Sequence, residues 1–145
     1  MKVKLGDIFS IKLPEEVDLY LGQVIYVKSK KISLVVFDCS NLEDLREETK
    51  IILFANTFDV YFQNEKWLIV TNLEPINFSF PNYKIETNKG LKKTDFHGNI
   101  TIELLPHEAV NYDFKMDVSP IVVEKALRAY GGYIPAEERF NSLYV

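Results

Sequence analysis

The stretch that decides the fold is YLGQVIYVKSKKISLVVFD, residues 20–38. Two runs rich in β-branched and aromatic residues, 23–27 and 32–37, flank the polar group 28–31, a pattern typical of an antiparallel hairpin. The second run, ISLVVF, is apolar nearly throughout, and its short length and β-branched residues favour a strand over a buried helical turn. We therefore expect residues 32–37 to form a central strand that is covered on both faces.

Further strand patterns occur on both sides of this hairpin, in residues 8–13, 50–60, 67–70 and 99–104. We expect a bend or bulge at Asn56 and Thr57, where the apolar run of the second pattern breaks. Trp67 opens the third pattern, and burying its large side chain would contribute strongly to a small core. Pro106 closes the last pattern, which is therefore expected to be an edge strand.

The segment 73–98 lacks a regular pattern. Pro and Gly residues divide it into short aromatic pieces, and residues 88–94 form a basic, turn-rich tip. Long irregular segments of compact domains are functional loops or mobile ones. We expect residues 81–98 to be the most mobile part of the chain, and we regard them as a second candidate contact surface.

The clearest helix lies near the C-terminus, at Pro120–Tyr130. Ser119 is placed as its N-cap and Pro120 as its first residue, and Gly131 or Gly132 ends it. Apolar residues at helical spacing form one stripe, which consists of Val122, Val123, Ala126, Leu127 and Tyr130.

The polar face of this helix carries Glu124, Lys125 and Arg128, which we expect to face water, so the apolar stripe should pack on the sheet. The sequence therefore predicts an α+β fold, with a predominantly antiparallel β-sheet and one C-terminal helix packed on it. The many short strands favour a sheet that is strongly bent or partly barrel-like. We expect a single domain over residues 1–145.

Composition limits the classes of function. The chain of 145 residues carries a net charge of -4, which argues against a broad nucleic-acid footprint and favours a basic partner. Cys39 is the single cysteine, so an internal disulfide is excluded and a reducing compartment is indicated; we expect it to be a small buried filler. No window approaches ~18 apolar residues. We expect a cytoplasmic protein with no membrane partner and no cofactor, and the sequence does not indicate an oligomeric state.

The most negative segment follows the hairpin. Glu43, Asp44, Glu47 and Glu48 lie within six positions, and Ser40 or Asn41 could cap a short helix there. Such a segment is either an ordinary solvated surface or a surface that binds a basic partner. At helical spacing, the four carboxylates would form a contiguous flank.

Two sets of residues could support catalysis or metal binding. His97, His107, Asp95 and Glu108 could be drawn together as a metal site, although two histidines ten positions apart are better explained as surface imidazoles. Asp7 and Asp59 could form an acid–base pair, although Gly6–Asp7 is also an ordinary way to start a strand. Phosphate loops, nucleophile elbows, HExxH and paired CxxC patterns are absent from the sequence. We therefore expect no metal site and no enzyme.

Several features resemble one family. They are the opening GDIFSIKLP at residues 6–14, the GQV at 22–24, the ILF at 52–54 followed by FDV at 58–60, and the WLIV at 67–70. In these features the chain resembles the bacterial immunity protein 26 family, which is found beside polymorphic toxin genes. The resemblance covers about half of the chain; Thr71 and Asn72 replace the Gly-rich end expected after the tryptophan strand.

The resemblance implies a β-rich intracellular protein that binds and neutralises a cognate toxin, and it assigns no catalytic residue. Glu43, Asp44, Glu47 and Glu48 are the first choice for partner contacts. One alternative is a barrel-like module for nucleic acid or peptide, with Tyr20, Tyr26 and Trp67 as a stacking face. A second alternative is a small hydrolytic enzyme that uses Asp7, Asp59 and a histidine.

Overall fold

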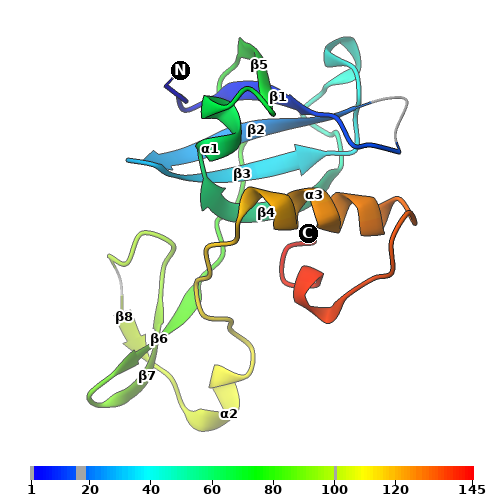
Figure 1. Ribbon diagram of the computed structural model, residues 1–145. Helices are drawn as coiled ribbons and strands as arrows, with labels where there is room; N and C mark the ends of the chain where they lie inside the picture. Colours follow the sequence, from blue (N-terminus) through cyan, green and yellow to red (C-terminus); the bar gives the residue numbers. More distant parts are fainter. Residues whose placement is uncertain (1, 16–18, 100) are drawn as a thin grey trace. The chain divides into compact units, whose positions relative to one another are not determined.

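The chain forms two compact units. The computed structural model describes residues 2–15, 19–99 and 101–145 (Figure 1). Unit 1 comprises Met1–Ile76 and Asp117–Val145, and unit 2 comprises Asn77–Met116. The expectation of a single domain over residues 1–145 stays a prediction.

Unit 1 is built on a five-stranded antiparallel sheet in the order β4-β3-β2-β1-β5. Its strands are β1 (Asp7–Ile11), β2 (Tyr20–Lys28), β3 (Lys31–Phe37), β4 (Ile51–Phe58) and β5 (Leu68–Asn72). Unit 2 holds a separate three-stranded sheet, so the antiparallel α+β class is correct. In the described residues β4 and β5 are the edges of the larger sheet and do not pair. The sheet is therefore not closed into a barrel, and its strong bend stays a prediction.

The hairpin β2–β3 confirms the prediction from residues 20–38. Lys28 pairs with Lys31, and Ser29 adopts a φ of +57° in the tight connection between them. Every residue from Ile32 to Phe37 is buried, as expected for a central strand that is covered on both faces.

The core of unit 1 contains an aromatic cluster. The Phe9 and Trp67 rings are stacked with centroids 5.5 Å apart, and Phe62 meets Phe9 edge-on at 4.9 Å. Phe62 belongs to α1 (Val60–Gln63). Gly22 faces this cluster, because a Cβ atom at this position would lie 2.5 Å from the Phe9 ring. Only glycine leaves room for the ring there.

The helix α3 (Pro120–Tyr130) has the bounds expected from the sequence, and it lies along the β4 side of the sheet (Figure 1). Val123, Ala126 and Leu127 are fully buried in the same core as the strands. Tyr130, at the end of the predicted stripe, is exposed. The prediction that Glu124 faces water is wrong, because its side chain is buried.

The β4 edge of unit 1 is covered by the chain itself. Phe54 donates its N–H to the Leu143 carbonyl at 2.8 Å, and Val145 donates to the Ile52 carbonyl at 2.9 Å. The short 3₁₀ helix η2 (Glu138–Phe140) places Phe140 in the core just before this segment.

Asn56 and Thr57 do not form the expected bend. They pair in regular register with Ser33 and Ile32, and the irregularity of β4 lies near its start, between the residues that pair with Val36 and Phe37. The polar side chains are accommodated by hydrogen bonds: Ser33 Oγ donates to Asn56 Oδ1 at 2.6 Å, and Thr57 Oγ1 donates to the Val118 carbonyl at 2.6 Å.

Unit 2 corrects the reading of residues 73–98 as irregular. Its strands are β6 (Tyr83–Thr87), β7 (Gly90–Thr94) and β8 (Thr101–Glu103), in the order β6-β7-β8. The basic tip is thus part of a hairpin, which turns at residues 88–89 and is followed by Gly90 with a φ of +100°. The strand expected at residues 99–104 is present as β8 at the edge of this sheet, although Ile100 lies outside the described residues.

A small aromatic cluster and the helix α2 (Pro106–Ala109) complete unit 2. Phe80 and Phe96 lie with ring centroids 4.5 Å apart, and the Lys115 ammonium lies 4.1 Å from the Phe96 ring centroid. Contacts of this kind add to the hydrophobic burial that a small unit can supply. The predicted mobility of residues 81–98 stays a prediction, as does their use as a contact surface.

Candidate partner-binding site

The acidic segment belongs to a loop, residues 39–50, that joins β3 to β4. Hydrogen bonds fix both of its ends to the sheet: the Cys39 carbonyl accepts the Leu21 N–H at 2.9 Å, and the Lys50 carbonyl accepts the Asp38 N–H at 2.8 Å. Because both ends are attached to central strands or their extensions, the loop has a defined position on unit 1.

Hydrogen bonds also hold the interior of the loop. Asn41 caps the 3₁₀ helix η1 (Leu42–Asp44), since its Oδ1 accepts the Glu43 N–H at 3.1 Å. The guanidinium of Arg46 donates to the backbone carbonyls of Glu43 and Leu45, at 2.5 and 3.0 Å. The guanidinium of Arg46 therefore binds the loop backbone, and it forms no ion pair with a carboxylate in the described part of the chain.

All four predicted partner-binding residues, Glu43, Asp44, Glu47 and Glu48, are exposed. None of their carboxylates takes part in an ion pair within the described ranges. The expected helical flank is wrong, because η1 ends at Asp44 and leaves Glu47 and Glu48 in the following turn. The helix does not continue past η1, because Arg46 and Thr49 close a turn. The Arg46 N–H donates to Thr49 Oγ1 at 2.8 Å, and the Thr49 N–H donates to the Arg46 carbonyl at 3.1 Å.

A hollow of about 460 Å³ lies beside this loop. Its described lining residues are Leu19, Tyr20, Asp38, Cys39, Ser40, Asp44, Thr49 and Lys50. Sequence reasoning found Asp44 but missed Asp38 and Lys50. Their place at the two ends of the loop is the signal that could have located them, because the ends of a loop between paired strands must lie close together.

Cys39 differs from its prediction, because it is half-buried at the hollow and not a filler of the core. Its thiol donates to the Asn41 carbonyl at 3.0 Å. The end of β3 leaves the sheet at this position, so the side chain lies at the rim of the unit and not under it.

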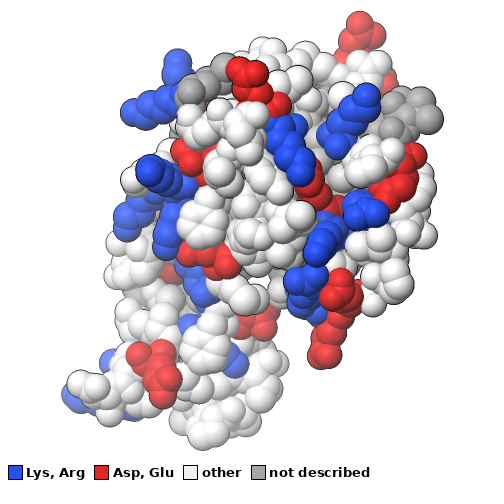
Figure 2. Space-filling view, in the orientation of Figure 1, with Lys and Arg blue, Asp and Glu red and all other residues white. Residues whose placement is uncertain are grey.

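Charged side chains of both signs are interspersed over the face of the protein that Figure 2 shows. Lys50, the last residue of the loop, already has a partner, since its Nζ donates to Tyr130 Oη at 3.3 Å and lies 5.6 Å from the ring centroid. The carboxylates of the loop are thus available to a partner molecule.

The aromatic face of Tyr20, Tyr26 and Trp67, considered as an alternative binding site for nucleic acid or peptide, is not formed. Trp67 is 1% exposed, so it is a core residue. Tyr20 and Tyr26 lie in β2, and the Tyr20 side chain packs against the core.

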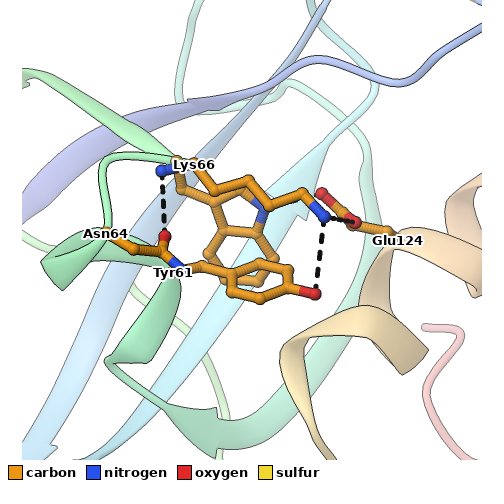
Figure 3. A network of polar contacts seen from close by, with 5 residues as sticks. Tyr61, Asn64, Lys66 and Glu124 are labelled. Atoms are coloured by element: carbon orange, nitrogen blue, oxygen red, sulfur yellow. Dashed lines mark hydrogen bonds and ion pairs between the residues drawn. The ribbon is translucent and has the colours of Figure 1, made fainter.

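The charged contacts around Trp67 explain why Glu124 is buried. The indole Nε1–H of Trp67 donates to Glu124 Oε2 at 3.1 Å. Figure 3 shows the contact of Lys66 with the same carboxylate, in which Nζ lies 3.2 Å from Oε1. Tyr61 completes the group, with its ring centroid 4.5 Å from Lys66 Nζ. Partial desolvation lowers the pKa of Lys66, but the contacts with Glu124 and Tyr61 outweigh it and raise the pKa above its usual value. The buried carboxylate thus has both a hydrogen-bond donor and a cation, as buried charges require.

The predicted acid–base pair is not brought together. Asp7 begins β1, whereas Asp59 follows β4, and β2 and β3 lie between these strands. Asp7 is buried, and its carboxylate accepts the Lys4 N–H at 2.8 Å and the Asn72 Nδ2–H at 2.9 Å. Its partners give Asp7 a structural role, the fixing of the start of β1 to the end of β5.

The two carboxylates of the metal site considered from the sequence accept backbone hydrogen bonds instead. Asp95 Oδ1 accepts the Asn99 N–H at 2.6 Å, and Glu108 Oε1 accepts the Leu105 N–H at 3.0 Å at the start of α2. Throughout the part of the chain that the structure describes, no group of three or more His, Cys, Asp or Glu side chains could hold a metal ion.

Comparisons with protein-family models, curated proteins and solved structures find no match to this chain. Among the helices of the described ranges, none is long and apolar enough to cross a bilayer. The case for a function therefore depends on the loop and on the resemblance in the sequence.

Proposed function

We propose that this protein is an immunity protein, which binds a cognate polymorphic toxin and neutralises it by covering its active site or an adjacent surface. The observation that carries the proposal is the set of exposed carboxylates on loop 39–50, which have no cation partner among the described residues although the loop backbone is held at both ends. The resemblance to the immunity protein 26 family supports the class of partner. We also infer a cytoplasmic location from it.

The physical basis is electrostatic substitution. A toxin that acts on a polyanion needs a basic cleft, and carboxylates can occupy such a cleft in place of phosphates. Long-range attraction between the loop and the cleft would speed the encounter of the two proteins. Because the loop is already ordered by its own hydrogen bonds, little conformational freedom would be lost on binding.

The test first identifies a toxin gene beside this protein's gene, as the proposal requires, and then measures association with its product. Glu43, Asp44, Glu47 and Glu48 are replaced together by Lys, and association rates are recorded over a range of salt concentrations. We expect the rate to fall about tenfold or more at low salt and to lose most of its salt dependence.

The control reverses four exposed acids elsewhere, Glu74, Glu86, Glu103 and Glu138, with the same change in net charge. A loop that contacts the toxin makes the first variant much slower than the second. Equal rates and equal salt slopes for the two variants would remove the loop from the interface, and a toxin that kills cells in the presence of the wild-type protein would contradict the proposed function itself.

A further inference from the structure

We propose that the hollow beside loop 39–50 receives a single arginine side chain of the partner. This inference rests on the proposed function and adds the chemical group that the site recognises. Two carboxylates of the same segment line the hollow, Asp38 directly after β3 and Asp44 at the end of η1. Its volume of about 460 Å³ is ample for one long side chain.

The two carboxylates are available to a ligand. Neither has a hydrogen bond or ion pair within the residues that the structure describes. Lys50 also lines the hollow, but its ammonium is held by the hydroxyl of Tyr130 at 3.3 Å. The hollow therefore presents more negative than positive charge, with its one described lysine directed to another partner.

The remaining lining favours arginine over lysine. Leu19 and Tyr20 supply apolar surface for a methylene stem, and the hydroxyls of Ser40 and Thr49 supply acceptors besides the carboxylates. A guanidinium offers five N–H donors in a planar fork, so it can bind carboxylate and hydroxyl oxygens at once, whereas an ammonium is a compact and more strongly hydrated charge.

The walls of the hollow are also held in place without a ligand. The hydrogen bonds from Leu21 to Cys39 and from Asp38 to Lys50 fix the wall that continues the sheet. The cap at Asn41 fixes the turn that carries Asp44. A preformed site of this kind binds without first ordering its own chain.

The experiment uses the intact protein and three capped tripeptides, Gly-Arg-Gly, Gly-Lys-Gly and Gly-citrulline-Gly, followed by chemical shifts of the backbone amides. We expect saturable shifts at residues 38–50 with the arginine peptide, weaker binding of the lysine peptide, and no saturation with the neutral citrulline peptide. Asp38→Asn and Asp44→Asn should each lower the affinity for the arginine peptide by about threefold or more, because each removes a charged partner of the guanidinium.

Glu47→Gln and Glu48→Gln are the matched controls, because these carboxylates lie on the same loop but do not line the hollow. The inference predicts that both leave the affinity nearly unchanged. Equal losses from all four neutralisations would show attraction by a diffuse acidic surface only, and would overturn the site, as would saturable binding of the citrulline peptide or no saturation by the arginine peptide. None of these results requires the toxin, so the arginine site can fail while the effect of loop reversal on toxin association stands.

Discussion

The helix α3 and the loop 39–50 both carry several charged side chains, but the molecule uses these charges in opposite ways. In α3, Glu124 contacts Trp67 and Lys66, and Arg128 Nε donates to Glu15 at 2.7 Å. In the loop, the backbone is held by hydrogen bonds, while the exposed carboxylates have no cation partner among the described residues. Charges of the helix have partners within unit 1, whereas we propose that the charges of the loop bind another molecule.

The presence or absence of a partner within the fold separates charges that stabilise the structure from charges that can serve recognition. A charge that the fold needs has its partners in place, and its removal leaves a buried group unsatisfied. A charge kept for recognition can be removed without such a cost. The predictions below test this division, from the largest expected change in unfolding free energy to the smallest.

The apolar face of α3 should give the largest effect. Leu127→Ala should lower the free energy of unfolding by about 2–5 kcal/mol, since Leu127 is fully buried in the core and its loss creates a cavity. Chemical denaturation measures the change. Ile121→Ala is the control on the same helix, because Ile121 is 43% exposed, and it should change stability by less than about 1 kcal/mol. Similar losses from the two variants would contradict the orientation of the helix.

The buried carboxylate should rank second. Glu124→Ala should destabilise by about 1–3 kcal/mol, because it leaves the indole N–H of Trp67 without its acceptor inside the core. Glu124→Gln should cost less, since an amide oxygen can still accept that hydrogen bond. If the two variants lost the same stability, the Trp67 hydrogen bond would not be the cause.

Most of unit 1 could be predicted from the sequence, because its strands follow a clear apolar pattern and α3 has strong end signals. Glu124 could not, because its burial depends on Trp67, which is distant in the sequence and reaches it only through the fold. The β6–β7 hairpin was not predictable either. Its strands, YKIET and GLKKT, carry lysines and few apolar residues, so the alternation of apolar and polar residues is weak.

The candidate site was predictable in part. A dense acidic run is visible in the sequence, and the cap at Asn41 follows from its residue type. The end of the helix at Asp44 was not predictable, because a backbone-bound arginine and the turn at Thr49 replace the helical hydrogen bonds. The hollow with Asp38 and Lys50 depends on the pairing of strand ends, which no local pattern encodes.

The ion pair between Arg128 and Glu15 should produce a smaller, pH-dependent effect. The hydrogen bond from Arg128 lowers the pKa of Glu15 below the usual glutamate value of about 4.3. A carboxyl with a lowered folded-state pKa contributes stability that is present above its unfolded pKa and is lost as the pH falls through the folded one. The difference in unfolding free energy between wild type and Glu15→Gln should therefore be present at neutral pH and vanish in acid.

The matched control for this measurement is Glu137→Gln, which removes an exposed pair with Arg139 and should show little pH-dependent difference. A difference for Glu15→Gln that stayed constant into acid would mean that packing of the side chain, and not its charge, is responsible.

Reversal of the four loop carboxylates should give the smallest effect on stability, although it should give the largest effect on association. Glu43, Asp44, Glu47 and Glu48 are exposed and have no cation partner in the described part of the chain, so each change to Lys should shift the unfolding free energy by about 0.5 kcal/mol or less. Thermal unfolding of the loop variant and of Glu124→Ala, measured under the same conditions, compares the two losses of stability. A loop variant as unstable as the Glu124 variant would show that these carboxylates serve the fold after all, and the division between the two regions would be wrong.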